Sequence, residues 1–193
     1  MRRTLTLALA TALFAALAAP AAMARPAWSE KSEATIVETA IALSGGETAG
    51  EFDGNAGDFD ILIQALLVTN AVALFDGTDY TVFAPTDQAF MDLASFLAGS
   101  TIDDEEVAFS TIAGAVGVNG VASVLAYHLT GRVRNSASVT RAADVTMLDG
   151  NTITARSGSV EAIGSTAGFV ATDVRVADGM IHVIDTVLLP FVP

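Results

Sequence analysis

The sequence has no cysteine, which excludes disulfide bonds and thiolate metal sites. Basic residues are also scarce: nine Lys and Arg stand against 22 Asp and Glu, and the formal net charge at pH 7 is −13. This charge repels nucleic acid and anionic membrane surfaces at long range, so nucleic acid is not an expected partner. His128 and His182 are the only two histidines, and they are the first candidates for acid–base chemistry or metal binding.

The motifs of several common enzyme classes are absent as well. The sequence has no G-x-S-x-G elbow of a serine hydrolase and no G-x-x-x-x-G-K-[ST] phosphate-binding loop. The glycines at 114, 117 and 120 follow no strand and do not form the dinucleotide-binding fingerprint. There is no Arg-Gly-Asp triplet and no N-x-[ST] glycosylation acceptor. Short motifs of these kinds therefore name neither a reaction nor a partner.

The first residues have the pattern of a secretory signal peptide. Arg2 and Arg3 precede an apolar run at 5–19, and Ala22-Met23-Ala24 supplies the small-x-small cleavage pattern. The run is shorter than the roughly 20 residues of a membrane-spanning helix. We therefore expect a secreted protein, periplasmic or extracellular, without a membrane span in its mature form. The expected division of the chain is a signal peptide at 1–24, a short lead at 25–33 and one domain at 34–193.

Helical patterns fill most of the first half of the expected domain. Thr35 and Glu38 have the spacing of a capping box, and an acidic, glycine-rich loop follows at 46–60. Tyr80 to Ala84 reads as a strand, and Pro85-Thr86-Asp87 after it favours a new helix. The expected helices begin at Thr35, at about Asp58 (running to Leu74), at Thr86-Asp87, near Asp103 and at Asn119.

Strand patterns dominate the second half. Asp149-Gly150 predicts a two-residue hairpin turn, and Asp178-Gly179 predicts a second tight turn. Helices first and strands later indicate an α+β domain with an antiparallel sheet system. The expected strands are 145–148, 151–155, 169–172, 174–176 and 180–189.

Three segments resemble the signatures of the fasciclin domain family. Residues 80–90 read YTVFAPTDQAF, residues 125–128 read LAYH, and residues 178–190 read DGMIHVIDTVLLP. They occur in the family's order and spacing, and the resemblance extends over about 34–192. The residues that carry it are Thr81, Val82, Phe83, Ala84, Pro85, Thr86, Asp87, Phe90, Tyr127, His128, Gly179, Ile181, His182, Val183, Ile184, Asp185, Leu188 and Pro190.

The resemblance implies a wedge of two small β-sheets with several helices packed on one side. It also implies an exported, non-enzymatic adhesion or interaction module that binds a cell-surface or matrix protein, a polysaccharide or a biofilm. The family has no typical catalytic centre, so no catalytic residue and no cofactor are expected. In this interpretation the signature residues are structural: both histidines are hydrogen-bonded parts of the fold, and Thr86, Asp87 and Asp185 cap helices or fix turns.

The acidic loop is the segment that the resemblance covers least. Asp53, Asn55 and Asp58 are its candidate calcium ligands, because calcium prefers clustered oxygen ligands. The spacing fits an EF-hand loop poorly, since Gln64 stands where a bidentate Glu is required. We expect Asp58 and Asp60 to favour the start of the next helix, the other acidic residues to be solvated, and no metal to be bound. An alternative function stays open: a periplasmic small-molecule or calcium-binding protein, or a hydrolase, using this loop or a pocket near His128.

Overall fold

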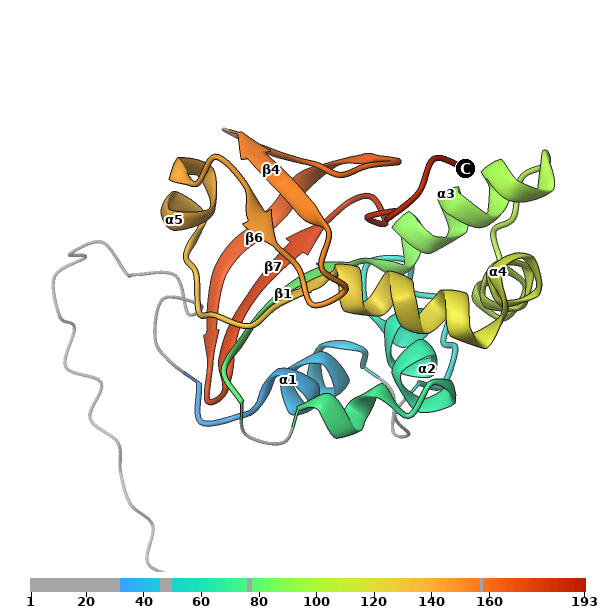
Figure 1. The fold of residues 1–193 in the computed structure, drawn as a ribbon. Helices are drawn as coiled ribbons and strands as arrows, with labels where there is room; N and C mark the ends of the chain where they lie inside the picture. The colour runs from blue at the N-terminus through green and yellow to red at the C-terminus, as the bar shows by residue number, and fades with distance from the viewer. Residues whose placement is uncertain (1–31, 46–49, 76–77, 157) are drawn as a thin grey trace, which may run out of the picture.

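The structure is a computed structural model in which residues 32–45, 50–75, 78–156 and 158–193 are described. The expected signal peptide at 1–24 and most of the lead at 25–33 lie outside these residues. The described chain combines helices with a mixed sheet, which confirms the α+β class (Figure 1). The helices are α1 (Ile36–Leu43), α2 (Asp60–Val68), the 3-10 helix η2 (Ala71–Leu74), α3 (Asp87–Ala98), α4 (Glu105–Tyr127) and α5 (Ser136–Arg141). The strands are β1 (Tyr80–Pro85), β2 (Leu129–Thr130), β3 (Val145–Thr146), β4 (Thr152–Arg156), β5 (Ser159–Glu161), β6 (Thr166–Val176) and β7 (Gly179–Ile184).

Local capping sets the start of α1. The backbone N–H of Thr35 donates to Glu38 Oε2 at 2.8 Å, and the backbone N–H of Glu38 donates to Thr35 Oγ1 at 3.2 Å. This reciprocal pair is the capping box predicted from the sequence. At α4, Asp104 accepts a hydrogen bond from the backbone N–H of Val107 at 2.9 Å, so the acidic run there also caps a helix.

Two helices differ from the sequence prediction. The helix expected at 58–74 is divided, because Asn70 adopts a left-handed conformation (φ 56°) between α2 and η2. The last two expected helices instead form the single long α4, whose backbone leaves the helical region at Gly117 (φ 69°, ψ 168°). The break therefore lies at a glycine, which tolerates positive φ, and not at the predicted cap Asn119. The short helix α5 was not predicted.

The sheet has the strand order β2-β1-β7-β6-β5-β4-β3. Most neighbours are antiparallel, but β1 and β7 are parallel, with Phe83 opposite His182. The expectation of an antiparallel sheet system was wrong at this pair, because the first strand and the last lie side by side after a connection of more than ninety residues. The turns also shift. Val176 pairs with Gly179, so the turn before β7 is Ala177-Asp178, and the β3–β4 connection spans 147–151.

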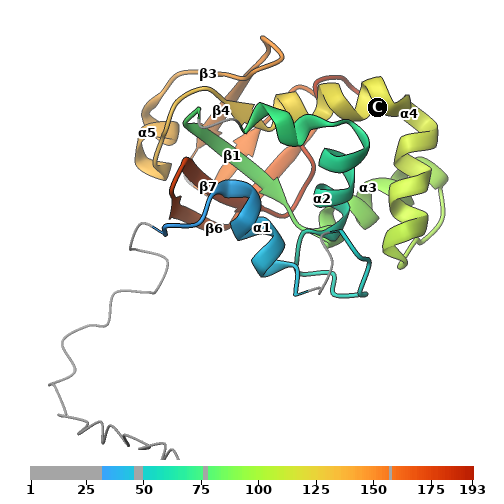
Figure 2. The same cartoon turned by 90° about the horizontal axis from the view of Figure 1, so that it is seen from below.

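The strands β6 and β7 join two halves of the domain. Two irregular registers bend β6 between Phe169 and Val174, so the strands expected at 169–172 and 174–176 are one bulged strand. Beyond the bend, β5, β4 and β3 extend the sheet over the other face of β1 and β7 (Figures 1 and 2). The two small sheets of the expected wedge are therefore the two ends of one continuous strand order.

Each half has its own hydrophobic core, on opposite faces of β1 and β7. Val82 and Ile181 point into the core shared with α1–α4. Phe83, next to Val82, and Ile184, three residues after Ile181, point into the core shared with β3–β5 and α5. Phe83 and Ile184 are fully buried, as their apolar strands predicted. This alternation follows the two-residue period of a strand, and burial on both faces explains why β1 and β7 are apolar along their length.

Helix α4 is long and apolar enough to span a membrane by length and composition alone, with 23 residues and a mean hydropathy of 1.6. The break at Gly117 divides it into two pieces, each shorter than the roughly 20 residues that a span needs. Buried residues in both pieces, Ala108 and Ile112 before the break and Val124 and Leu125 after it, pack in the core with α2 and α3. The helix therefore packs one side against the domain, with 22% of its apolar window buried.

Candidate functional site

The three signature segments meet at the centre of the fold. The first contains β1 and the start of α3, and the third contains β7, which pairs with β1. The Tyr127-His128 pair ends α4 and leads into β2, on the other side of β1. Most signature residues are buried there, namely Thr81, Val82, Phe83, Ala84, Pro85, Thr86, Asp87, Phe90, Tyr127, His128, Gly179, Ile181, His182, Val183, Ile184 and Leu188. Asp185 is exposed and Pro190 is half-buried.

His128 connects the end of α4 to the segment after β7. The backbone N–H of Leu188 donates to His128 Nε2 at 2.9 Å, so the ring proton resides on Nδ1, which donates to the carbonyl of Val124 at 2.7 Å. Burial lowers the pKa of His128 to about 4, because the charged form loses its hydration. The imidazole is therefore neutral at physiological pH, and both of its nitrogens are engaged by the backbone.

His182 makes a second connection of the same type. The backbone N–H of Asp173 donates to Nδ1 at 3.2 Å, and Nε2 donates to the carbonyl of Arg134 at 3.0 Å. Burial lowers the pKa of this ring as well. The ring also contacts Phe83 and Phe169, with ring centres 5.5 and 5.9 Å away. The two histidines point into different parts of the fold and do not form a common site.

Asp87 has a role that its place in the sequence did not reveal. It was expected to cap the helix that it begins, but its carboxylate accepts hydrogen bonds from the first amides of α2 instead: Asp60 N–H at 2.8 Å and Ile61 N–H at 2.9 Å. Thr86 is the N-cap of α3 but makes no side-chain capping bond. The carboxylate of Asp185 accepts from the N–H of Gly168 at 2.7 Å and so fixes β6 to the end of β7.

Carboxylates gather around this cap. Asp58, Asp60 and Asp87 offer oxygens that all lie within 4.8 Å of one another, and Asp53, Asp58 and Glu105 form a second such group. We call these five residues the carboxylate cluster. Asp58, Asp60, Asp87 and Glu105 are buried, each at most 4% exposed, whereas Asp53 is exposed. The cluster joins the loop after α1, the start of α2, the start of α3 and the start of α4.

The electrostatics of the cluster are unfavourable for ionised side chains. Burial, followed by the charge of Asp58, raises the pKa of Asp60 to about 6. Burial raises the pKa of Asp87 as well, and a hydrogen bond with Asp58 raises it further. Burial also raises the pKa of Glu105. Among the described residues, the salt bridge present joins Arg156 to Glu161, so no basic side chain there pairs with the cluster. The cluster therefore concentrates negative charge without a protein counter-charge.

The sequence prediction identified only part of this cluster. Asp53 and Asp58 were candidate ligands and lie in it, whereas Asn55 turns its side-chain oxygen to the backbone N–H of Gly57 at 3.3 Å. Asp60 begins α2, as expected of a residue that favours the helix start, but both Asp58 and Asp60 are buried, which the sequence did not indicate. The sequence did contain one indication that Asp60 is buried, because it is an acidic residue within the apolar run 59–67. No sequence signal connects Glu105 to the loop, because the two meet only through the packing of α4.

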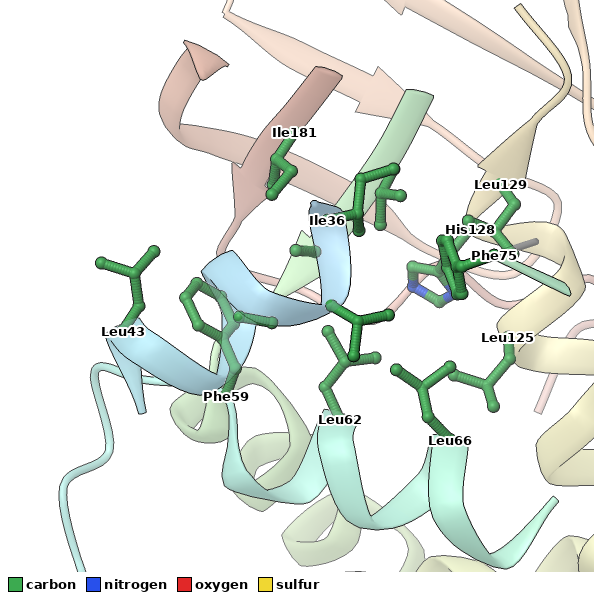
Figure 3. A pocket seen from close by; sticks show the side chains of 14 residues that line it. Ile36, Leu43, Phe59, Leu62, Leu66, Phe75, Leu125, His128, Leu129 and Ile181 are labelled. Atoms are coloured by element: carbon green, nitrogen blue, oxygen red, sulfur yellow. The ribbon is translucent and has the colours of Figure 1, made fainter. Parts of the chain in front are cut away.

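A narrow apolar pocket lies beside His128. Its volume is about 30 Å³, roughly the share of one water molecule, and side chains of α1, α2, β7 and the end of α4 line it (Figure 3). His128 is the one polar side chain among its lining residues, and both of its ring nitrogens already have partners. The pocket near His128 is thus too small for a metabolite in this conformation.

A wider groove runs between α3 and the C-terminal segment. Its volume is about 240 Å³, and it is lined by Leu93, Phe96, Leu189 and Pro193 among others. Phe96 is 66% exposed there, and the nearby Phe191 and Val192 are exposed as well. This groove is larger than the pocket beside His128, and it carries exposed aromatic and aliphatic side chains.

Comparisons with known proteins agree with this fold. The fasciclin domain family model matches residues 57–190. Protein sll1483 of Synechocystis sp. is 28% identical over 163 residues, which cover 83% of each chain. Uncharacterized protein sll1735 of the same organism is 27% identical over 139 residues, which cover 68% of this chain and 89% of that one.

A solved structure of a FAS1 domain pair, from the insect cell adhesion molecule fasciclin I, is similar at 20% identity with a TM-score of 0.47. The alignment covers 65% of this chain and 43% of the domain pair. The family model covers more than half of the chain, including all three signature segments. The chain belongs to the fasciclin domain family.

Proposed function

We propose that this fasciclin domain is an exported, non-enzymatic adhesion module that binds a protein or polysaccharide of a cell surface or matrix. The observation that carries the proposal is the family match, which spans residues 57–190 and thus most of the described domain. Export is supported by the signal-peptide pattern at 1–24. The net charge of −13 favours basic patches on a partner.

The state of the histidines supports a non-enzymatic role. A general base must offer a free nitrogen to a substrate, with a pKa near the working pH. His128 and His182 are both buried, both have lowered pKa values, and their nitrogens are hydrogen-bonded to backbone groups. Both imidazoles of the chain therefore serve the fold.

The groove between α3 and the C-terminal segment is the contact surface that we assign to the partner. Exposed aromatic side chains are enriched at the energetic centres of interfaces, and Phe96 is the most exposed aromatic residue among the described exposed hydrophobics. Leu93 and Leu189 form the apolar floor beside it. Asp92 and Asp185 also line the groove, so a partner with basic residues around an apolar centre fits it.

The direct test is binding of the purified, labelled protein to whole cells and to a panel of extracellular polysaccharides. Phe96→Glu is expected to weaken binding by about tenfold or more, which corresponds to about 1.4 kcal/mol or more, without lowering Tm. Val170→Glu is the matched control, because Val170 is 60% exposed on β6 and is not among the residues that line the groove. Equal binding by both variants would refute the groove, and the absence of binding to every surface would refute adhesion.

Export is tested separately by N-terminal sequencing of the protein recovered outside the cytoplasm. We expect the mature chain to begin near Arg25, after Ala22-Met23-Ala24. A mature protein that still carries the apolar run at 5–19 would be membrane-anchored and would contradict the proposal.

A further inference from the structure

We propose that the carboxylate cluster binds a divalent cation, and that calcium is the ion whose coordination it fits. The site consists of Asp53, Asp58, Asp60 and Glu105, and Asp87 positions the start of α2 beside it. This inference does not depend on adhesion, since it rests on side chains in the interior of the domain.

The argument begins with Asp58, which is 2% exposed. Among the described residues, no backbone N–H, hydroxyl or basic side chain donates to either of its carboxylate oxygens, and the carboxyl of Asp87 could donate to Asp58 only in its protonated form. Asp60 Oδ1 and Glu105 Oε1 are buried without a donor as well. Burying an ionised carboxylate without a partner is strongly unfavourable, so such groups are paired, protonated or bound to a metal. Four oxygens thus lack a partner among the described residues, and Asp60 and Glu105 each offer an oxygen within 4.8 Å of one of Asp58.

In Asp60 and Glu105 the other carboxylate oxygen is occupied by a backbone donor. Asp60 Oδ2 accepts from the N–H of Asp53 at 3.3 Å, and Glu105 Oε2 accepts from the N–H of Gly54 at 3.1 Å. Each side chain is therefore fixed by one oxygen and leaves the second one free. This division of labour is typical of metal ligands, whose orientation depends on hydrogen bonds to the surrounding protein.

Asp87 acts as the positioning residue. Both of its oxygens accept backbone N–H groups at the start of α2, so it contributes orientation to the site and has no free oxygen for a metal. Its own backbone N–H donates to the carbonyl of Asp58 at 3.0 Å. Asp87 thus holds both neighbours, Asp58 and Asp60, in place.

The chemistry of the donors selects the ion. All candidate ligands are carboxylate oxygens, which suit hard cations, and no imidazole or thiolate is close enough to form part of either group. Calcium takes six to eight oxygens in flexible geometry, whereas magnesium requires a near-octahedral shell and retains several waters. Four or five protein oxygens with water completing the shell fit calcium. Asp53, Asp58 and Asp60 are close in sequence, but Glu105 comes from α4, so the site is not an EF-hand loop.

Shared protons are the alternative way to relieve the repulsion. The raised pKa values of Asp60, Asp87 and Glu105 describe the cation-free cluster, in which Asp53, Asp58 and Asp104 also face these groups.

The test uses the purified protein after removal of metal by a chelator. At pH 7.5, calcium chloride at 10 to 100 times the dissociation constant should raise Tm by about 3–10 °C, and calorimetry should detect binding of one ion per chain. Magnesium chloride at the same concentration should raise Tm less. An equal response to magnesium would overturn the assignment to calcium.

Asp58→Asn is the decisive variant, because the amide keeps the shape of the side chain and removes its charge. It should abolish the calcium-dependent rise of Tm and increase Tm of the calcium-free protein, since one repelling charge is gone. Glu106→Gln is the matched control, because Glu106 is the exposed neighbour of Glu105 in α4 and should respond to calcium like the parent. Glu105→Gln should behave as Asp58→Asn does and replaces it if that variant fails to fold.

Two results would overturn the proposal. The first is a parent protein whose Tm and heat of mixing do not respond to calcium up to about 10 mM. This concentration is about ten times the dissociation constant of the weakest extracellular calcium sites, about 1 mM. In that case the repulsion within the cluster is relieved without a cation. The second is a calcium response that Asp58→Asn and Glu105→Gln both retain in full, which would place the ion elsewhere.

Discussion

Replacing His128 by phenylalanine tests how much the two hydrogen bonds of this buried ring contribute to the free energy of unfolding. Phenylalanine keeps an aromatic ring of similar size but cannot hydrogen-bond, so the N–H of Leu188 and the carbonyl of Val124 lose the partners described above. Both groups are in the interior, and each unsatisfied buried polar group costs about 1–3 kcal/mol. The expected loss is therefore about 2–6 kcal/mol, against a total stability of about 5–15 kcal/mol for a typical domain.

The dependence of stability on pH gives an independent measure of the same residue. The pKa of His128 falls from 6.5 to about 4 on folding, because burial disfavours the charged ring. The unfolded chain then binds the proton more tightly, so the stability from this residue is complete above pH 6.5 and is lost as pH falls towards 4. The loss amounts to about 3 kcal/mol, at about 1.4 kcal/mol for each pH unit between the two pKa values.

Urea denaturation of the parent and of His128→Phe at several pH values between 4 and 8 measures both effects. The carboxylate cluster acts with the opposite sign over part of this range, so the difference between parent and variant at each pH is the informative quantity. We expect this difference to be largest above pH 6.5 and to shrink towards pH 4. His128→Gln should lose less stability, because its amide can replace one of the two bonds.

A variant with the stability of the parent at every pH would refute the role of His128 as a connector. A variant that keeps its fold but loses a measurable turnover would favour the enzymatic alternative instead.

Three further substitutions test the same fold by circular dichroism and urea denaturation. Phe83→Ala should lose about 3–5 kcal/mol, because the side chain is fully buried and no disulfide compensates; an unchanged Tm would mean that β1 is misassigned. Tyr127→Phe should lose about 1–3 kcal/mol, because its hydroxyl donates to the carbonyl of Thr152 at 2.9 Å; a stable variant would show that water replaces this bond. Gly179→Ala should prevent the native pairing of β1 and β7, because the added Cβ would collide with the carbonyl of Tyr80; native-like stability would contradict this register.

The sequence alone determined the features that are encoded within a few residues. The capping box at Thr35 and Glu38 requires two side chains three positions apart, and the structure confirms it. The apolar runs at 80–84 and 180–189 predicted two strands, and the structure has buried strands at Tyr80–Pro85 and Gly179–Ile184. The signature segments together predicted the α+β class and the fasciclin family, because their order and spacing are properties of the chain itself.

Tertiary structure decided whatever depends on contacts between distant segments. The parallel pairing of β1 with β7 follows from the path of the chain between them, which no local pattern specifies. Asp87 caps a helix 26 residues earlier, and Asp178 accepts the N–H of Ile36 across 142 residues. Periodicity and capping rules describe a residue's nearest neighbours, so they placed both residues at turns or helix starts of their own segments.

The carboxylate cluster shows the same limit most clearly. In the sequence, Asp58 and Asp60 belong to an acidic loop and Glu105 to a helix start, which are ordinary places for solvated charges. Packing of α4 against α2 buries Glu105 beside the loop and removes water from all three carboxylates. The composition of the sequence determined that the protein is acidic, but only the fold decided which of its charges lie inside, because desolvation depends on neighbours that the sequence does not reveal.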